Sequence, residues 1–113
     1  MPNKSKVYLD DILQSIERIE KYAKNSSFEE FVKNTILSDA VIRNLEIIGE
    51  AVKRLPAEIK KECDEIEWKK IAGLRDILIH EYSGVNLEII WDVVANKIPK
   101  LKIAIKKIMA DLK

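Results

Sequence analysis

The sequence has very few of the residues that build disulfides and metal centres. Its 113 residues include one cysteine, Cys63, and one histidine, His80. A lone cysteine forms no disulfide within the chain, and such chains are typical of a reducing cytoplasm, where we expect this one. Zinc centres usually recruit three or four such ligands, so the composition excludes most metal sites unless carboxylates or a second chain contribute. We therefore expect no metal ion and no cofactor.

Glycine and proline are also scarce, with three of each, and no apolar run approaches the roughly 20 residues that a membrane span needs. We therefore expect no membrane partner, and the N-terminal "MPNKSKVYLDD" lacks the apolar stretch and cleavage site of a secretory signal. The alternation typical of strands is absent, whereas apolar residues recur at spacings of three and four. The sequence therefore predicts an all-α fold, formed as a single domain over residues 1–113.

An excess of charge of one sign is missing as well, because 20 Lys and Arg residues face 19 Asp and Glu residues. This balance excludes the strongly basic character on which nonspecific nucleic-acid binders rely. Any contact with RNA must therefore come from a local patch. The best basic patch is the lysine-rich face of the last segment, although such a face is most often only solvated: Lys97, Lys100, Lys102, Lys106 and Lys107.

The first half of the sequence predicts two helical regions separated by a break. The first region carries an apolar stripe of helical spacing that predicts a core face: Ile12, Ile16, Ile19 and Ala23. The stretch "NSSFEEF" then breaks the pattern, and Ser27 with Glu30 has the spacing of a capping box, which predicts a new helix start. Helical spacing continues from residue 35 to residue 55, until Pro56 ends it.

Several residues of this long helix do not fit simple packing. Gly49 lies in the helix interior, where glycine costs about 1 kcal/mol relative to alanine, so we expect close contact with another helix there. Arg43 and Glu46 are expected on a solvated face, and Glu50 receives no definite role.

The second half predicts two further helical regions. Asp64 and Glu67 repeat the capping-box spacing before "WKKIAGLRDILIHEYS", and Asn86 suits the N-cap of the helix that follows. The last segment carries an apolar seam with alternating steps of four and three, for which bundle packing is favoured over a coiled coil: Val94, Ile98, Leu101, Ile105, Ile108 and Leu112. Pro99 interrupts this seam and predicts a bend in the helix.

The stretch "GLRDILIHEYSGV" contains the only histidine, close to the predicted end of a helix. Arg75 and His80 are five residues apart and lie about 140° apart around an ideal helix, so one chain does not bring them to one face. Arg75 and Tyr82 do share a face, and Asp76 is four residues before His80, within reach to orient its imidazole. An arginine and a histidine at this spacing are by themselves a weak signal.

The strings "GLRDILIHEYSGVNLEIIWDVV" and "DAVIRNLEIIGEAVKRLP" strongly resemble the HepT-like ribonuclease toxins of the HEPN superfamily, and the similarity covers nearly the whole chain. The resemblance implies a four- or five-helix up-and-down HEPN bundle that forms a homodimer, with two copies of the motif lining one cleft. It also implies metal-independent cleavage of RNA, with Arg75 and His80 as the catalytic pair and Asp76 in a supporting position.

The same resemblance implies the toxin of a type VII-like toxin and antitoxin system. Its partner would be a minimal nucleotidyltransferase that silences the toxin by transferring AMP to Tyr82. Two alternatives stay open from the residues: a catalytically silent HEPN dimer that serves as a binding module for the nucleotidyltransferase, or a helical dimer in which the motif is purely structural. An independent argument for a shared site is that RNA cleavage without a metal uses an acid and a base, whereas one chain offers one imidazole.

Overall fold

The computed structural model describes residues 4–80 and 86–112, with residues 79 and 80 described by their backbone. Every element in these ranges is helical, so the predicted all-α fold is confirmed. In chain order the elements are α1 (Lys4–Ala23), α2 (Phe28–Lys33), α3 (Thr35–Arg54), α4 (Ala57–Lys60), the 3₁₀ turn η1 (Lys61–Cys63), α5 (Trp68–His80), α6 (Leu87–Asp92), the π-helical turn η3 (Val93–Lys97) and α7 (Ile98–Asp111).

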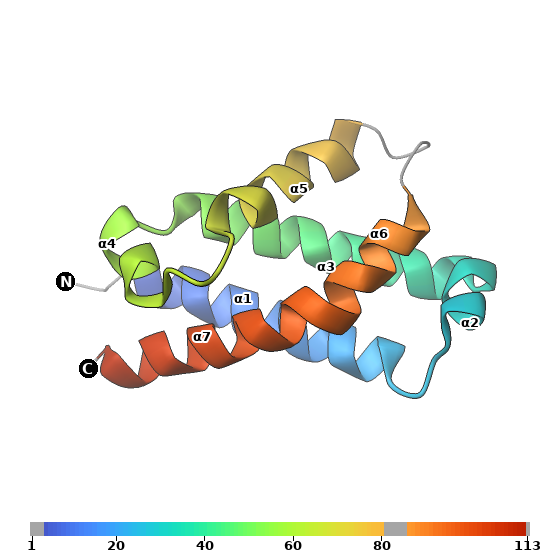
Figure 1. The fold of residues 1–113 in the computed structure, drawn as a ribbon, viewed down its shortest axis with the longest axis horizontal. Coiled ribbons are helices and arrows are strands. Elements are labelled where there is room, and N and C mark those ends of the chain that lie inside the picture. Colours follow the sequence, from blue (N-terminus) through green and yellow to red (C-terminus); the bar gives the residue numbers. More distant parts are fainter. Residues whose placement is uncertain (1–3, 81–85, 113) are drawn as a thin grey trace.

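The long helices run up and down along one axis (Figure 1). α3 runs antiparallel to α1 and packs against it, and α5 runs antiparallel to α3 along its outer side. The stretch from α6 to α7 then returns towards the end of the bundle where the chain starts, and α7 packs against α1. The arrangement is therefore the predicted up-and-down helical bundle.

The core lies between α1, α3 and α7. The first three members of the predicted α1 stripe are fully buried, while Ala23 at its end is half-buried. The predicted seam of α7 is buried from Ile98 to Ile108, while Val94 and Leu112 at its two ends are half-buried. The apolar spacing therefore identified the core faces, and its outermost members lie where the helices end.

Local hydrogen bonds define several helix ends. Both bonds of the predicted capping box before α2 are present, since Glu30 N donates to Ser27 Oγ over 3.2 Å and Ser27 N donates to Glu30 Oε1 over 3.3 Å. Asn86 caps α6 as predicted, with its Oδ1 accepting from Glu88 N over 2.9 Å. α3 begins behind Asn34, whose Oδ1 accepts from Leu37 N over 3.0 Å, a cap that the sequence analysis missed.

The predicted capping box of Asp64 and Glu67 is wrong. α5 begins at Trp68, so Asp64 lies too far before the helix to cap it. The Trp68 indole N–H instead donates to the carbonyl oxygens of Lys60 and Cys63, both over 3.0 Å. A buried indole needs a partner for its N–H, and these two carbonyls belong to the short helical turns that precede α5. The ring therefore fixes where α5 starts.

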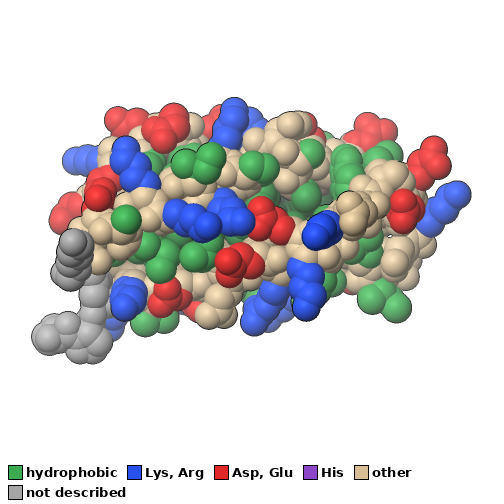
Figure 2. Space-filling view, turned by 90° about the horizontal axis from the view of Figure 1, so that it is seen from below, with side chains coloured by type: hydrophobic (Ala, Val, Ile, Leu, Met, Phe, Trp, Pro, Cys, Tyr) green, Lys and Arg blue, Asp and Glu red, His purple; other side chains and the backbone are tan. Residues whose placement is uncertain are grey.

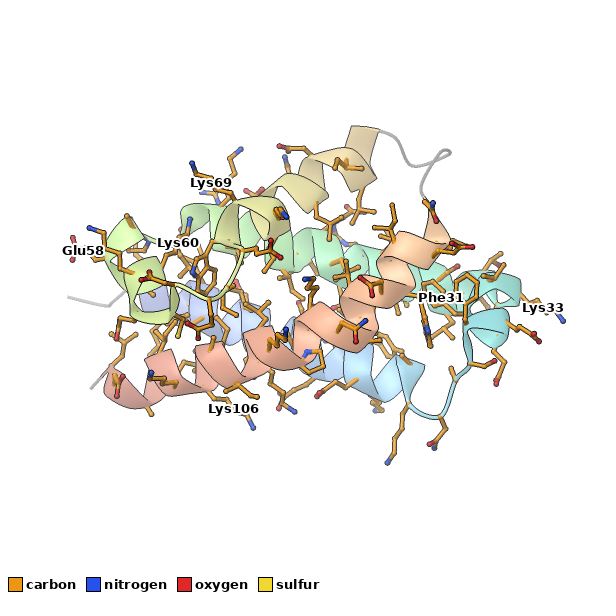
Figure 3. All side chains as sticks on the ribbon, in the orientation of Figure 1. Phe31, Lys33, Glu58, Lys60, Lys69 and Lys106 are labelled. Atoms are coloured by element: carbon orange, nitrogen blue, oxygen red, sulfur yellow. The ribbon has the colours of Figure 1, made fainter. Side chains whose placement is uncertain are left out.

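The interruption predicted at Pro99 takes the form of a π-helical turn. Over Val93–Lys97 the helix widens, and Ile98 N donates to Val93 O, five residues earlier. Pro99 follows at the start of α7, where a missing backbone N–H is tolerated. Side chains from α6 and α2 pack together beside this segment, with the ring centroids of Phe31 and Trp91 5.1 Å apart, and Figure 3 places Phe31 between the two helices.

None of the helices in the described residues has the length and apolar character needed to cross a membrane.

Candidate functional site

The candidate site begins with the close approach of α5 to α3. A Cβ atom added to Gly49 would lie 2.6 Å from the Cβ of Arg75 and 3.1 Å from the carbonyl oxygen of Ile71. Real Cβ atoms do not approach other carbon atoms so closely, so only glycine allows the two helices to meet here. The close helix contact predicted for Gly49 is therefore confirmed, and its partner is the backbone at Arg75.

Arg75 is held on this contact by two carboxylates. Its Nε lies 3.1 Å from Glu50 Oε2, and its Nη1 donates to Asp76 Oδ1 over 3.0 Å. The side chain is 31% exposed. A guanidinium carries five N–H donors, and among the described residues Nη2 has no partner within bonding distance. Arg75 is thus held by two carboxylates, and its Nη2 is a candidate for binding an anion.

Glu50 connects Arg75 with a second arginine. Its other oxygen, Oε1, accepts from Arg54 Nε over 3.0 Å, and Arg54 Nη2 lies 2.9 Å from the same oxygen. The hydrogen bond to this carboxylate raises the pKa of Arg54 above its ordinary value. Each oxygen of Glu50 therefore faces a different arginine, one on its own helix and one on α5. The sequence alone assigns no role to Glu50, although its place directly after Gly49 was the available signal.

A pocket of about 280 Å³ opens beside these residues, between α1, α3 and α5. Arginines and carboxylates line it together: Tyr8, Asp11, Arg43, Glu46, Ile47, Glu50, Ala51, Arg54 and Arg75. Arg43 is 70% exposed, as predicted, whereas Glu46 is only 18% exposed and lies 3.7 Å from Arg43. The solvated face predicted for these two residues is therefore correct for Arg43 and wrong for Glu46, whose side chain is part of the pocket wall.

The other predicted site residues lie along α5 and beyond it. His80 is the last residue of α5, which is α-helical throughout, so residues 75 and 80 keep the angular offset that the sequence predicts. The structure pairs Asp76 with Arg75, and the contact of Asp76 with the imidazole stays a prediction. Tyr82 lies outside the described residues. Within one chain the structure thus brings Arg75 together with Asp76 and Glu50.

The lysine-rich face of α7 is less basic than its sequence suggests. Lys97 Nζ lies 3.2 Å from Glu67 Oε1, and Lys102 Nζ lies 2.7 Å from Glu20 Oε1. Figure 2 shows basic and acidic side chains interspersed over the face of the molecule that it views, and Lys106 points outward from α7 in Figure 3. These pairings favour the interpretation of a solvated, mixed surface over a dedicated RNA patch.

Comparison with known proteins identifies the family. The family described as "Ribonuclease HepT-like" matches residues 12–108. A Methanocaldococcus jannaschii protein named "Gamma-glutamylcyclotransferase and putative RNase" is 51% identical over 107 residues, which are 95% of this chain and 48% of that protein. The chain therefore spans about half the length of that relative.

Two further relatives match over most of their length. A "Putative RNase" of Caldanaerobacter subterraneus is 50% identical over 90% of this chain and 91% of its own. The "Probable ribonuclease HepT" of Thermococcus cleftensis is 44% identical over 90% of this chain and 93% of its own. No solved structure gives a significant match. The chain belongs to the HepT-like ribonuclease family.

Proposed function

We propose that the chain is an endoribonuclease that cleaves RNA without a metal ion, with Arg75 and His80 as its catalytic pair. The observation that carries this proposal is the anchored guanidinium of Arg75 in a chain of the HepT-like ribonuclease family. Its Nη2, which has no partner among the described residues, is suited to the oxygens of a phosphodiester, since arginine binds phosphate through planar, charge-assisted hydrogen bonds.

The chemistry requires more than a phosphate-binding group. The 2′-hydroxyl must lose a proton, the pentacoordinate phosphorus must be stabilised, and the leaving 5′-oxygen must gain a proton. An imidazole, whose ordinary pKa is about 6.5, is suited to both proton transfers near neutral pH. We assign these transfers to His80 and the stabilisation of the phosphorane to Arg75, with Asp76 in support.

A shared cleft between two chains supplies what one chain lacks. Arg75 and His80 lie about 140° apart around α5, so the Arg75 and His80 of one chain do not converge on one phosphate. In a homodimer, Arg75 of one protomer can act beside His80 of its partner, and two imidazoles are present to serve as base and acid. The proposed active species is therefore the homodimer.

The proposed biological role is that of a type VII-like toxin. Its antitoxin would be a minimal nucleotidyltransferase that transfers AMP to the phenol oxygen of Tyr82, next to the catalytic histidine in sequence. AMP attached there would place a bulky anion at the proposed cleft and exclude RNA. The relatives' names support the ribonuclease part of this proposal, and the antitoxin part rests on the resemblance of the motif.

The test of the activity is incubation of the purified protein with labelled RNA in the presence of a chelator. Wild-type protein should cleave, and His80→Ala should lose roughly 10² to 10⁴ in rate, the usual contribution of a positioned acid or base. Absence of cleavage by the wild type would favour the alternative, a silent HEPN dimer that serves as a binding module for the nucleotidyltransferase.

The test of the silencing is the intact mass of the protein coexpressed with a minimal nucleotidyltransferase. Each added AMP gives a discrete mass increment, which Tyr82→Phe should abolish while it retains RNA cleavage. An unchanged increment in Tyr82→Phe would move the modification to another residue.

A further inference from the structure

We propose that Glu50 is a positioning residue for Arg75, which holds the guanidinium in the orientation that the RNA phosphate requires. The inference rests on the proposed function of Arg75 and extends it to a carboxylate on a different helix. Glu50 does not touch the substrate in this scheme and acts through Arg75.

The geometry of the carboxylate carries the proposal. Glu50 Oε2 lies 3.1 Å from Arg75 Nε, while Oε1 accepts from Arg54 Nε over 3.0 Å. Arg54 is one turn further along α3, so it holds the Glu50 side chain in place from its own helix. A carboxylate fixed in this way presents its second oxygen to α5 in a defined direction. Arg54 and Glu50 therefore form a rigid support for Arg75.

The backbone places this support within reach. Gly49, the residue before Glu50, lets α3 approach the Cβ of Arg75 to a distance that any other residue would prevent. Because the two helices meet directly under the arginine, its side chain reaches the neighbouring carboxylate while part of it stays exposed. Gly49 and Glu50 thus act on the same side chain, the first by spacing the helices and the second by binding the guanidinium.

The charges are compatible with phosphate binding. Arg54 and Arg75 balance the charges of Glu50 and Asp76, so the group has no excess negative charge that would repel an anion. The contact to Nε also leaves Nη2 without a partner among the described residues. An arginine side chain loses rotamer entropy when it is fixed. Glu50 restricts the Arg75 side chain before RNA binds, so less side-chain entropy is lost when the transition state forms.

The variants of Glu50 should form a graded series. Glutamine keeps the shape of the side chain but has one acceptor oxygen, so Glu50→Gln must give up one of the two arginines. We expect kcat to fall roughly 10- to 100-fold in Glu50→Gln, as for a modest misplacement of a catalytic group, with a smaller change in KM. Glu50→Ala should lose more, and Glu50→Asp, which keeps the charge, should lose less.

The matched control is Glu20→Gln, which breaks the ion pair with Lys102 between α1 and α7. It removes one interhelical glutamate charge, as Glu50→Gln does, but away from Arg75, so its kcat should stay near the wild-type value. A second comparison uses Arg75→Ala as background. There Glu50→Gln should change the residual rate less than twofold, because its effect passes through the arginine. The pH at which the rate is half-maximal should also stay unchanged in Glu50→Gln, since the proton transfers belong to His80.

A measurement independent of cleavage completes the test. The Nε–Hε group of Arg75, assigned by the loss of its NMR signal in Arg75→Lys, should show a lower order parameter in Glu50→Ala than in wild type. If wild-type protein cleaves RNA through His80 but Glu50→Gln keeps the full kcat, or loses activity equally in the Arg75→Ala background, the positioning role is wrong and the proposed function stands. If the wild type does not cleave at all, the proposed function fails, and the positioning role fails with it.

Discussion

α1 and α5 represent two ways of attaching a helix to this bundle. α1 packs against both α3 and α7 and buries the whole middle of its apolar stripe. α5 makes its main contact with α3, leaves Ile77 52% exposed, and has open space around Gly73. The helix that supports the fold therefore follows the apolar period closely, whereas the helix that carries the motif departs from it and keeps polar and apolar surface free.

The largest expected effect concerns His80, the last residue of α5. Mixing His80→Ala chains with wild-type chains should give heterodimers that have lost most of the cleavage activity, because a shared cleft would lack either its base or its acid. The measurement is the cleavage rate of heterodimers isolated through two different affinity tags. A heterodimer that keeps about half of the wild-type rate would mean that each chain acts alone, and would remove the mechanistic reason for a shared site.

The next effect concerns the supporting helices. Ile105→Ala removes a fully buried side chain of α7 and should lower the free energy of unfolding by about 2–5 kcal/mol. The matched control is Ile103→Ala on the same helix, where the side chain is 72% exposed and the expected change is within about 0.5 kcal/mol. Urea denaturation measures both, and similar losses for the two variants would mean that residue 103 is covered in solution.

A sharper comparison uses two glycines: Gly49 of α3, which contacts α5, and Gly73, which lies within α5. Gly49→Ala places a methyl group against the Arg75 backbone and should cost about 1–3 kcal/mol of stability, with a loss of cleavage rate as α5 shifts. Gly73→Ala meets nothing within 4 Å and should instead stabilise the helix by about 0.5–1 kcal/mol, since alanine is the better helix former. Thermal unfolding of the two variants should therefore shift in opposite directions. A stabilising Gly49→Ala would show that α3 and α5 are further apart than described.

The smallest effect concerns Glu67, between the start of α5 and η3. Its carboxylate lies 2.8 Å from Lys70 Nζ and 3.2 Å from Lys97 Nζ, and the bonds to Lys70 first and Lys97 second lower its pKa below the ordinary value. A lowered pKa in the fold means that Glu67 adds stability above its ordinary pKa and loses this contribution as the pH falls through the folded pKa. In Glu67→Gln the free energy of unfolding should therefore fall slightly less than in the wild type as the pH is lowered through the acidic range, which urea denaturation at a series of pH values measures.

Salt offers the control for this prediction. The ion pairs of Glu67 with Lys70 and Lys97 are exposed, so their effect on the stability of the wild type should shrink in concentrated salt. In Glu67→Gln this effect should be absent at any ionic strength. If the free energy of unfolding of both proteins falls equally with decreasing pH at low salt, other carboxylates cause that fall.

The same comparison explains which features the sequence could reveal. The core faces of α1, α3 and α7 were predictable because burial repeats with the period of the helix, and the caps at Ser27 and Asn86 were predictable because they involve residues within a single turn. The pairing of Glu50 with Arg75 was not, because it requires the distance between two helices that are remote in sequence. The start of α5 was misplaced because the deciding bonds of Trp68 run to backbone carbonyls, which leave no trace in residue type.

The π-helical turn before Pro99 has a rotational consequence for the last segment. Ile90 and Ile98 are both buried and eight residues apart, a spacing that would place them about 80° apart around a regular α-helix. The π-helical turn accommodates one additional residue, so the side chains of α6 are rotated by about 100° about the helix axis relative to their positions in a continuous α-helix. This brings Ile90 into line with the seam of α7, and it turns Trp91 towards Phe31 on α2. Deleting a single residue from Val93–Lys97 should therefore restore a continuous α-helix in which Ile90 and Ile98, then seven positions apart, stay on one face and α6 keeps its packing.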